Sequence, residues 1–332
     1  MDKGIKEALI KQLAAGQFVS GQQLGEQFGV SRAAISKHVK GLKEMGLDVF
    51  RVTGKGYKLD APIQLLEQEQ INNRLAESAS PAKADVYSII DSTNDHLMRR
   101  LPNNIEKGQV CIAEYQSAGR GRRGRQWISP FGSHLYFSMY WRLDKGMSAA
   151  MGLNIIAALA VSDAIKALYN IDVQLKWPND VYLDGVKLAG ILIDLDGQAL
   201  EPCHCVIGIG LNIKMPATSA EQVDQPWTDI SQHLDGPIDR NELVAEIIHQ
   251  LCNRLAIHEV EQDPTIISQW QARDYFYNKP VRLISGEKEI QGICQGIDQQ
   301  GALMLKINGE LKAMYGGELS LRAANTDAQQ TT

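Results

Sequence analysis

The 332-residue sequence is poor in aromatic residues, at 6%, and has only five cysteines. An odd number of cysteines in a long chain, with no signal-peptide pattern in front, favours reduced thiols in a cytoplasm over a disulfide framework. No run reaches the roughly 18 apolar residues of a membrane span, so we expect no contact with a membrane. With 44% hydrophobic residues, the chain is predicted to fold as two or three domains of a cytoplasmic protein.

The short cluster Cys203-His204-Cys205 contains residue types that bind metals. No second cluster nearby in the sequence supplies the other ligands of a four-coordinate site. On a strand, Cys203, Cys205 and Ile207 would share one face, which favours buried thiols in a core over a metal site. The sequence therefore assigns no metal ligands.

The net charge of −5 is unevenly distributed along the chain. Residues 1–60 contain ten Lys and Arg against six Asp and Glu, a net +4. The rest contains 24 of the 34 basic and 33 of the 39 acidic residues, a net −9. A basic head on an acidic body indicates that only the head meets nucleic acid.

The basic head has the pattern of a winged helix-turn-helix. Apolar residues at helical spacing predict a helix over 3–15. Two further helices follow, with Ser20 (and Gln23 in a capping box) and Ser31 as their N-caps, Gly29 in the turn between them, and the second running to about Met45. LDVFRVTGKGYKL then predicts a basic hairpin, the wing.

The second of these helices is predicted to have an apolar and a cationic face. Its inward residues are Ala34, Ile35, Val39 and Leu42. Its outer face suits a major groove about 12 Å wide, with cations on phosphates and short polar groups near bases. The predicted DNA contacts are Gly21, Arg32, Ser36, Lys37, Lys40 and Lys55. The alternative is a small helical domain with a solvated basic face.

The body alternates strand and helix patterns, which predicts an α+β domain with helices on one side of a sheet. The predicted strands are VYSII, GQVCIAEYQ, HLYFSMYWRL, VQLKW, KLAGILIDL and CHCVIGIGLNI, and AAMGLNIIAALAVSDAIKAL is predicted to be a long apolar helix. From about residue 272, short strands between Gly and Asn turns predict a small β barrel.

The segment GRGRRGRQW (119–127) follows a predicted strand, where ligand sites tend to lie. Its glycines let the backbone wrap closely, and its four arginines supply forked donors for an anion. Because neighbouring arginines repel each other, we expect this loop to be mobile without a compact anion. Trp127 can stack on a nucleobase, which favours a nucleotide phosphate over duplex DNA. An RNA-binding loop and a merely solvated loop are the alternatives.

A second charged segment, KWPNDVYLDGVKLAGIL (176–192), carries Lys176, Asn179, Asp180 and Lys187. Two lysines and a carboxylate near one loop suit the phosphates of a magnesium-bound nucleotide. For any one of these lysines alone, solvation at the surface is the alternative.

Taken in order, DSTN (91–94), EYQSAGRGRRGRQW (114–127), KWPNDVYLDGVKLAGIL and GIGLN (208–212) closely resemble the motifs of the biotin protein ligases. With a helix-turn-helix in front, the chain resembles the bifunctional bacterial type, a ligase and biotin operon repressor. The resemblance runs from about residue 8 to 322. It implies a class II synthetase-like mixed sheet in the centre and an SH3-like β barrel at the C-terminus.

The resemblance implies that biotin and ATP form biotinyl-5'-AMP, and that the biotinyl group passes to a lysine of the biotin carboxyl carrier protein. It places eight residues at biotin: Ser92, Thr93, Asn94, Gln116, Arg120, Gly121, Arg122 and Lys187. It places six at the nucleotide: Arg125, Trp127, Lys176, Asn179, Asp180 and Asn212. Arg122 and Lys187 are the catalytic candidates, since cations offset the repulsion between a carboxylate and a phosphate. Mg²⁺ is expected to bridge the phosphates, with Asp180 as a weaker candidate contact.

The resemblance also implies regulation, in which an adenylate-bound homodimer binds operator DNA and the carrier protein competes for the same surface. A biotin-sensing transcription factor without catalysis and a lipoate or other acyl ligase are the two rival functions. In GIGLN, Gly208 and Gly210 are expected to relieve packing beside the site, and Asn212 is a candidate to reach the nucleotide. The predicted division of the chain is 1–64, 65–271 and 272–322, with a disordered tail at 323–332.

Overall fold

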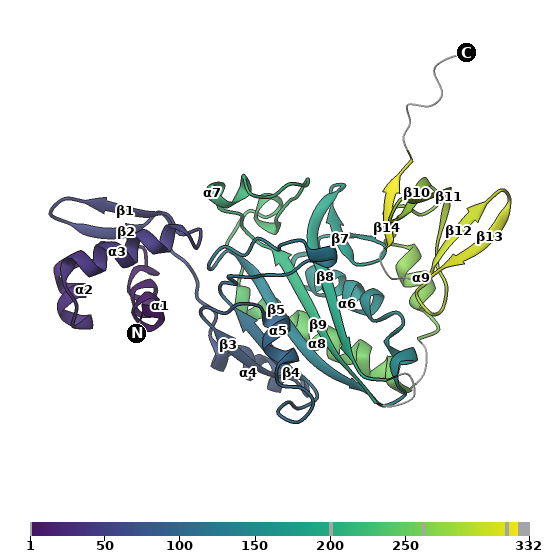
Figure 1. Ribbon diagram of the computed structural model, residues 1–332, viewed down its shortest axis with the longest axis horizontal. Coiled ribbons are helices and arrows are strands. Elements are labelled where there is room, and N and C mark those ends of the chain that lie inside the picture. The colour runs from purple at the N-terminus through teal and green to yellow at the C-terminus, as the bar shows by residue number, and fades with distance from the viewer. Residues whose placement is uncertain (1, 199–201, 261–262, 316–318, 325–332) are drawn as a thin grey trace, which may run out of the picture.

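The computed structural model describes residues 2–198, 202–260, 263–315 and 319–324 (Figure 1). In chain order it consists of a small helical domain with a hairpin, a central sheet flanked by helices, and an antiparallel β domain. The three parts lie in a row in Figure 1, with the central sheet in the middle. This confirms the predicted α+β multidomain architecture.

The N-terminal domain is a helix-turn-helix followed by a wing, as predicted. Its elements are α1 (Asp2–Leu13), α2 (Gly21–Phe28), α3 (Arg32–Lys43), β1 (Val49–Val52) and β2 (Gly56–Leu59), with β1 and β2 antiparallel. The Ser31 side chain caps α3 by accepting from the backbone N–H of Ala34 at 3.2 Å. The Ser20 side chain accepts from Gln22, not from the Gln23 that a capping box requires. Gly29 has φ 66°, the left-handed conformation expected in the turn.

The central sheet has seven strands in the order β3-β4-β5-β9-β8-β7-β6. Only β3 and β4 pair in parallel; every other neighbouring pair is antiparallel, so the sheet is mixed. The strands are β3 (Lys83–Tyr87), β4 (Gln109–Ala113), β5 (His134–Leu143), β6 (Gln174–Lys176), β7 (Asp180–Leu183), β8 (Val186–Asp196) and β9 (Cys203–Asn212).

Helices cover both faces of this sheet, so the prediction of helices on one side is wrong. Leu135 and Phe137 of β5 face the large core that α4 (Gln68–Glu77), α6 (Leu153–Tyr169) and α8 (Arg240–Val260) complete. On the opposite face, α5 (Thr93–Met98) packs Leu97 against Tyr140 of the same strand. The remaining helical segments are η1 (Arg122–Gly124), η2 (Met147–Ala150), α7 (Ala217–Ala220), η3 (Ile230–His233) and α9 (Ile266–Gln271).

The segment Met147–Tyr169 is long and apolar enough to cross a membrane by length and composition. It contains Asp163 and Lys166, so it is not the uninterrupted apolar run on which the sequence-based expectation rested. Most residues of α6 (Leu153–Tyr169) are buried, because this helix lies in the core and packs against α8. Its apolar character is that of a core helix.

Cys203, Cys205 and Ile207 belong to the same core cluster, which confirms that they share one face of a strand. Burial raises the pKa of the Cys205 thiol well above its usual range, so this sulfur stays protonated. All five cysteines are free and buried.

The C-terminal domain is a five-stranded antiparallel sheet in the order β13-β12-β11-β10-β14. Its strands are β10 (Pro280–Ser285), β11 (Lys288–Ile297), β12 (Leu303–Ile307), β13 (Glu310–Met314) and β14 (Leu319–Ala323). Asn308 and Gly309 both have positive φ in the β12–β13 turn, as a two-residue hairpin requires. Ala323 ends β14, so the chain stays ordered past the predicted start of the tail, and residues 325–332 lie outside the described ones.

Candidate functional site

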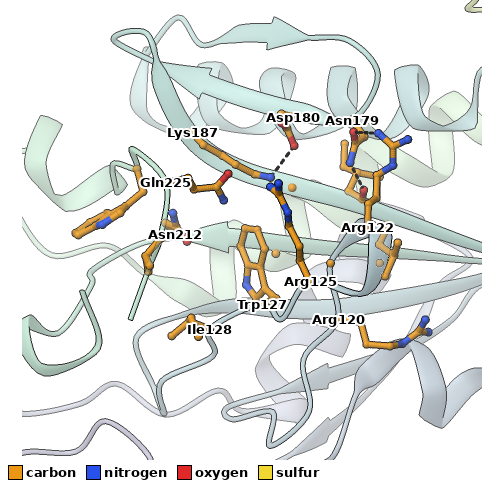
Figure 2. A pocket seen from close by; sticks show the side chains of 18 of the residues that line it. Arg120, Arg122, Arg125, Trp127, Ile128, Asn179, Asp180, Lys187, Asn212 and Gln225 are labelled. Carbon is orange, nitrogen blue, oxygen red and sulfur yellow. Dashed lines mark hydrogen bonds and ion pairs between the residues drawn. The ribbon is translucent and has the colours of Figure 1, made fainter. Parts of the chain in front are cut away.

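One cavity of about 620 Å³ opens beside the arginine loop, the segment Gly119–Trp127. Figure 2 shows that its walls come from this loop and from the strands β7, β8 and β9. Every residue predicted for biotin or the nucleotide lines it: Ser92, Thr93, Asn94, Gln116, Arg120, Gly121, Arg122, Arg125, Trp127, Lys176, Asn179, Asp180, Lys187 and Asn212. The fold thus gathers motifs that lie far apart in the sequence, while their individual roles stay predictions.

A buried polar cluster forms one end of the cavity. Gln116 Oε1 accepts from the backbone N–H and the hydroxyl of Thr93, at 2.9 and 3.1 Å. Ser138 donates to Asn94 Oδ1 at 2.5 Å and also lies 2.7 Å from the Thr93 hydroxyl. Ser92 holds the start of α5 by accepting from the backbone N–H of Asp95 at 3.3 Å. These bonds fix donors and acceptors in place, which is what recognition of a small polar group requires.

The Trp127 indole packs against two glycines, Gly190 and Gly210, at the centre of the cavity. Gly190 and Gly210 face each other across β8 and β9. A Cβ atom on Gly210 would lie 2.5 Å from the indole, and one on Gly190 would lie 2.9 Å from it. A Cβ atom on Gly208 would lie 2.0 Å from Asn94 Oδ1. The glycines of GIGLN therefore relieve packing beside the site.

Positive charge gathers along the side of the cavity formed by β6, β7 and β8. Lys187 Nζ lies 2.7 Å from Asp180 Oδ1 and 5.5 Å from the centre of the Trp127 ring. Lys176 donates to the Tyr182 hydroxyl at 2.7 Å. Burial lowers the pKa of Lys176, with Arg322 and Lys187 lowering it further against the opposing effect of Asp180. An anion bound here would offset this repulsion between cations.

The arginine loop forms a defined turn over the cavity. The backbone N–H of Gly121 donates to the carbonyl of Arg125 at 2.7 Å, and that of Trp127 donates to Gly119 at 2.9 Å. Arg122 donates to Asn179 Oδ1 at 2.8 Å. In Figure 2 the Arg125 side chain points toward the end of Lys187, whereas Arg120 points away from it.

Sequence reasoning missed several residues that line the cavity. Tyr182 of β7 lies within the motif at 176–192 but was not singled out, whereas Arg322 of β14 and residues 222–227 in the loop after α7 come from more distant segments. The available signal in the sequence was the polar and aromatic residues of that loop. The structure places Trp227 beside Lys187 in an isolated bridge. Asn212, predicted at the nucleotide, donates to the carbonyl of Thr228 at 3.0 Å and so anchors this loop.

The predicted DNA face lies far from this cavity, on α3 and the wing. Arg32, Lys37, Lys40 and Lys55 are exposed, and Ser36 is half-buried. Gly21 is buried, and a Cβ atom there would lie 2.9 Å from the Tyr57 ring. Because glycine has no side chain, any contact of Gly21 with DNA would be made by its backbone, and Tyr57 encloses this position.

The N-terminal domain contacts the segment that follows the arginine loop. Phe131, four residues after Trp127, is 2% exposed within the core of the helix-turn-helix domain. Its backbone N–H donates to the carbonyl of Met45 at 2.8 Å. Phe131 thus links the segment after the arginine loop to the helix-turn-helix domain.

Comparison with known proteins assigns the chain to a family. The sequence profile of the Biotin/lipoate A/B protein ligase family matches residues 86–212, that of an HTH domain matches 6–58, and that of the Biotin protein ligase C terminal domain matches 276–322. The bifunctional ligase/repressor BirA of Escherichia coli is 47% identical over 97% of this chain and 99% of its own length. The chain belongs to the biotin protein ligase family.

Other members of the biotin protein ligase family support this placement. The bifunctional ligase/repressor BirA of Salmonella typhimurium is 46% identical over 97% of this chain and 99% of its own length. A biotin protein ligase from Aquifex aeolicus, solved in complex with biotin and ATP, matches with a TM-score of 0.63 and 26% identity. That match covers 73% of this chain and 99% of the other. Within the family, the chain groups with the bifunctional ligase/repressors.

Proposed function

We propose that this protein joins biotin to ATP to form biotinyl-5'-AMP and passes the biotinyl group to a lysine of the biotin carboxyl carrier protein. We propose further that its adenylate-bound dimer represses biotin-synthesis genes in the cytoplasm. The observation that carries the proposal is the cavity, which is lined by the buried polar cluster, by the Trp127 indole and by several cationic side chains. Membership of the biotin protein ligase family gives the substrates.

In this proposal biotin lies at the polar end of the cavity. The fixed hydroxyl and amide groups of Thr93, Asn94 and Gln116 match the donors and acceptors of a ureido ring. Ser92, Arg120, Gly121 and Arg122 complete the biotin side, and Lys187 meets the carboxylate. The adenylate lies toward Trp127, whose Nε1 is buried with no hydrogen-bond partner among the described residues. Arg125, Lys176, Asn179, Asp180 and Asn212 complete the nucleotide side.

Lys187 and Arg122 are the proposed catalytic residues. The biotin carboxylate attacks the α-phosphorus, the bond from this phosphorus to the bridging oxygen breaks, and pyrophosphate leaves. Because both reactants are anions, fixed cations stabilise the charge on the transferring group. Lys187 is held by Asp180, and Arg122 by Asn179, so both side chains are oriented before the ligand arrives. Orientation in advance reduces the cost of reorganisation during the reaction.

Mg²⁺ is part of the proposal as a partner of the phosphates. Among the described residues, no group of three His, Cys, Asp or Glu side chains could hold a metal ion. The carboxylates that line the cavity are Asp180 and Asp224, and Asp180 is paired with Lys187. These residues fit an ion that would be held mainly by phosphate oxygens and water, with Asp180 as a weaker candidate contact. Such an ion would neutralise phosphate charge.

One assay tests the proposed reaction against its two rivals. The full chain is incubated with ATP, labelled biotin and a biotin carrier domain, with labelled lipoate in a parallel reaction. We expect label on the carrier lysine from biotin and not from lipoate. Labelled biotin that binds but never reaches the carrier would support a sensor without catalysis, and transfer of lipoate alone would support the other ligase class.

We predict that biotinyl-5'-AMP increases dimerisation of this protein. Ordering of loops over the adenylate can be coupled to a second surface of the protein, here the dimer interface. A two-fold dimer would then place its two α3 helices at DNA half-sites that are one or more helical turns apart. Sedimentation velocity at fixed protein concentration should show a larger dimer fraction with the adenylate than with ATP or biotin alone. An unchanged dimer fraction would contradict this regulation without touching the ligase reaction.

A further inference from the structure

The turn between β6 and β7 is hydrogen-bonded to the C-terminal domain. This turn, residues 177–179, is called the cavity turn here, because it lines the cavity together with the flanking Lys176 and Asp180. Trp177 is 2% exposed, and its indole Nε1 donates to the carbonyl of Gly301 at 3.0 Å. Gly301 lies in the turn between β11 and β12 of the C-terminal domain. A side chain of the cavity turn thus reaches a backbone group of another domain.

The β11–β12 turn that accepts this bond is fixed by its own contacts. Asp298 Oδ1 accepts from two backbone N–H groups of this turn, both at 2.9 Å. Gly301 has φ 79°, in the left-handed region that favours glycine. A Cβ atom on Gly301 would lie 3.0 Å from Cα of Gly152, the N-cap residue of α6. The β11–β12 turn therefore packs against the backbone of the central domain and leaves no space there for a side chain.

Two other elements hold the remaining residues of the cavity turn. The carbonyl of Pro178 accepts from Asn154 Nδ2 of α6. Asn179 Nδ2 donates to the carbonyl of Ile191 on β8 at 2.8 Å, and the backbone N–H of Ile191 donates to the carbonyl of Asn179 at 2.9 Å. Each residue of the cavity turn is thus tied to a different element, and Trp177 is the one of the three that is tied to the C-terminal domain.

The Trp177 contact bears directly on the position of Lys176. β6 (Gln174–Lys176) is a three-residue strand at the edge of the sheet, so few bonds to neighbouring strands hold its end. Lys176 is its last residue and directly precedes Trp177. If the indole N–H lost the Gly301 carbonyl, a buried donor would be left without its partner, and the indole would have to move to find another. A displaced indole would displace Lys176 with it.

We propose that Trp177 is a positioning residue, through which the C-terminal domain holds the cavity turn in the geometry that the nucleotide requires. It acts through its neighbours Lys176 and Asn179, which are proposed to contact the nucleotide. Fixing these groups before the nucleotide arrives removes part of the ordering cost of binding. That consequence for ATP rests on the proposed function, whereas the support of the cavity turn by the C-terminal domain does not.

The test measures hydrogen exchange of the ligand-free full chain over residues 174–183, which span β6, the cavity turn and β7. Gly301→Ala places a methyl group against the Gly152 backbone, and Trp177→Phe removes the indole N–H while an aromatic ring remains. We expect each variant to raise the exchange rate of this segment about tenfold. Gly309→Ala is the matched control and should leave the rate unchanged, because Gly309 has a similar φ of 89° in the same domain but its Cβ position lies in open space.

Steady-state kinetics of pyrophosphate release separate positioning from general destabilisation. If Trp177 positions the cavity turn, the KM for ATP should rise about fivefold in Gly301→Ala and Trp177→Phe, with kcat, the affinity for biotin and hydrogen exchange in β5 near their wild-type values. Wild-type exchange over 174–183 in both variants, or an equal increase in Gly309→Ala, would overturn the support by the C-terminal domain.

Two further outcomes distinguish this inference from the proposed function. Raised exchange over 174–183 with an unchanged KM for ATP would overturn the role of Trp177 toward the nucleotide. Raised exchange in the two variants, together with no adenylate formation by the wild type, would keep the support of the cavity turn and reject the proposed function.

Discussion

Lys187→Ala should lower the rate of biotinyl-5'-AMP formation by a factor on the order of 10² to 10³, the usual effect of removing one group that stabilises transition-state charge. Lys187 Nζ lies at the meeting point of the cavity's two ends, 2.7 Å from Asp180 and above the Trp127 ring. Its removal leaves the Asp180 carboxylate uncompensated, which adds repulsion toward the incoming phosphates. Release of pyrophosphate in a single turnover, measured without carrier protein, isolates this step.

Lys166→Ala is the control for the loss of a lysine. Lys166 is exposed on α6 and pairs with Asp172, away from the cavity. We expect wild-type rates from this variant. A wild-type rate of adenylate formation from Lys187→Ala would remove this lysine from the catalytic role and would leave Arg122 as the candidate.

Operator binding should fall about tenfold for each of Lys37→Glu and Lys40→Glu, with a shallower dependence of affinity on salt. Both side chains are exposed on α3, the helix predicted to enter the major groove. Reversing a charge there replaces attraction to a phosphate by repulsion. Binding to operator DNA at several salt concentrations, measured in the presence of the adenylate, gives both quantities.

Lys11→Glu on α1 is the matched reversal in the same domain, since Lys11 is exposed on a different helix. Its effect on operator affinity should be much smaller. Unchanged affinity and salt dependence in Lys37→Glu and Lys40→Glu would mean that this face of the helix-turn-helix domain does not meet DNA. The ligase reaction should be unaffected in all three variants.

The fold could be predicted from the sequence where a periodic pattern extends over a whole element. The two capped helices of the head, the apolar α6 and the alternating strands have such patterns. The six-residue α5 is too short for a periodic signal, which is why its place on the opposite face of the sheet was missed. The apolar window over Met147–Tyr169 depends on averaging along the chain, so a count of uninterrupted runs overlooks it. The domain boundaries remain predictions.

The candidate site was predicted through its motifs, which the fold brings to one cavity. What the motifs could not give is the direction of each side chain. Arg120 stands within the arginine loop, yet its partner Asp194 is 74 residues away and comes close only through the pairing of β8 in the sheet. The loop alone therefore predicts repulsion, whereas the fold places a carboxylate beside one of its arginines. In the same way, Gly21 begins a DNA-binding motif but is enclosed by Tyr57 of the wing.

The most direct test of the central claim, that the arginine loop binds an acyl-adenylate, is a crystal structure of the full chain with biotinyl-5'-AMP. We predict the ureido ring beside Thr93 and Gln116, the adenine toward Trp127, and Arg122 and Lys187 within hydrogen-bonding distance of the phosphate or the acyl oxygen. An adenylate bound in the cavity with residues 119–127 turned away from it, or bound at another surface, would contradict the account.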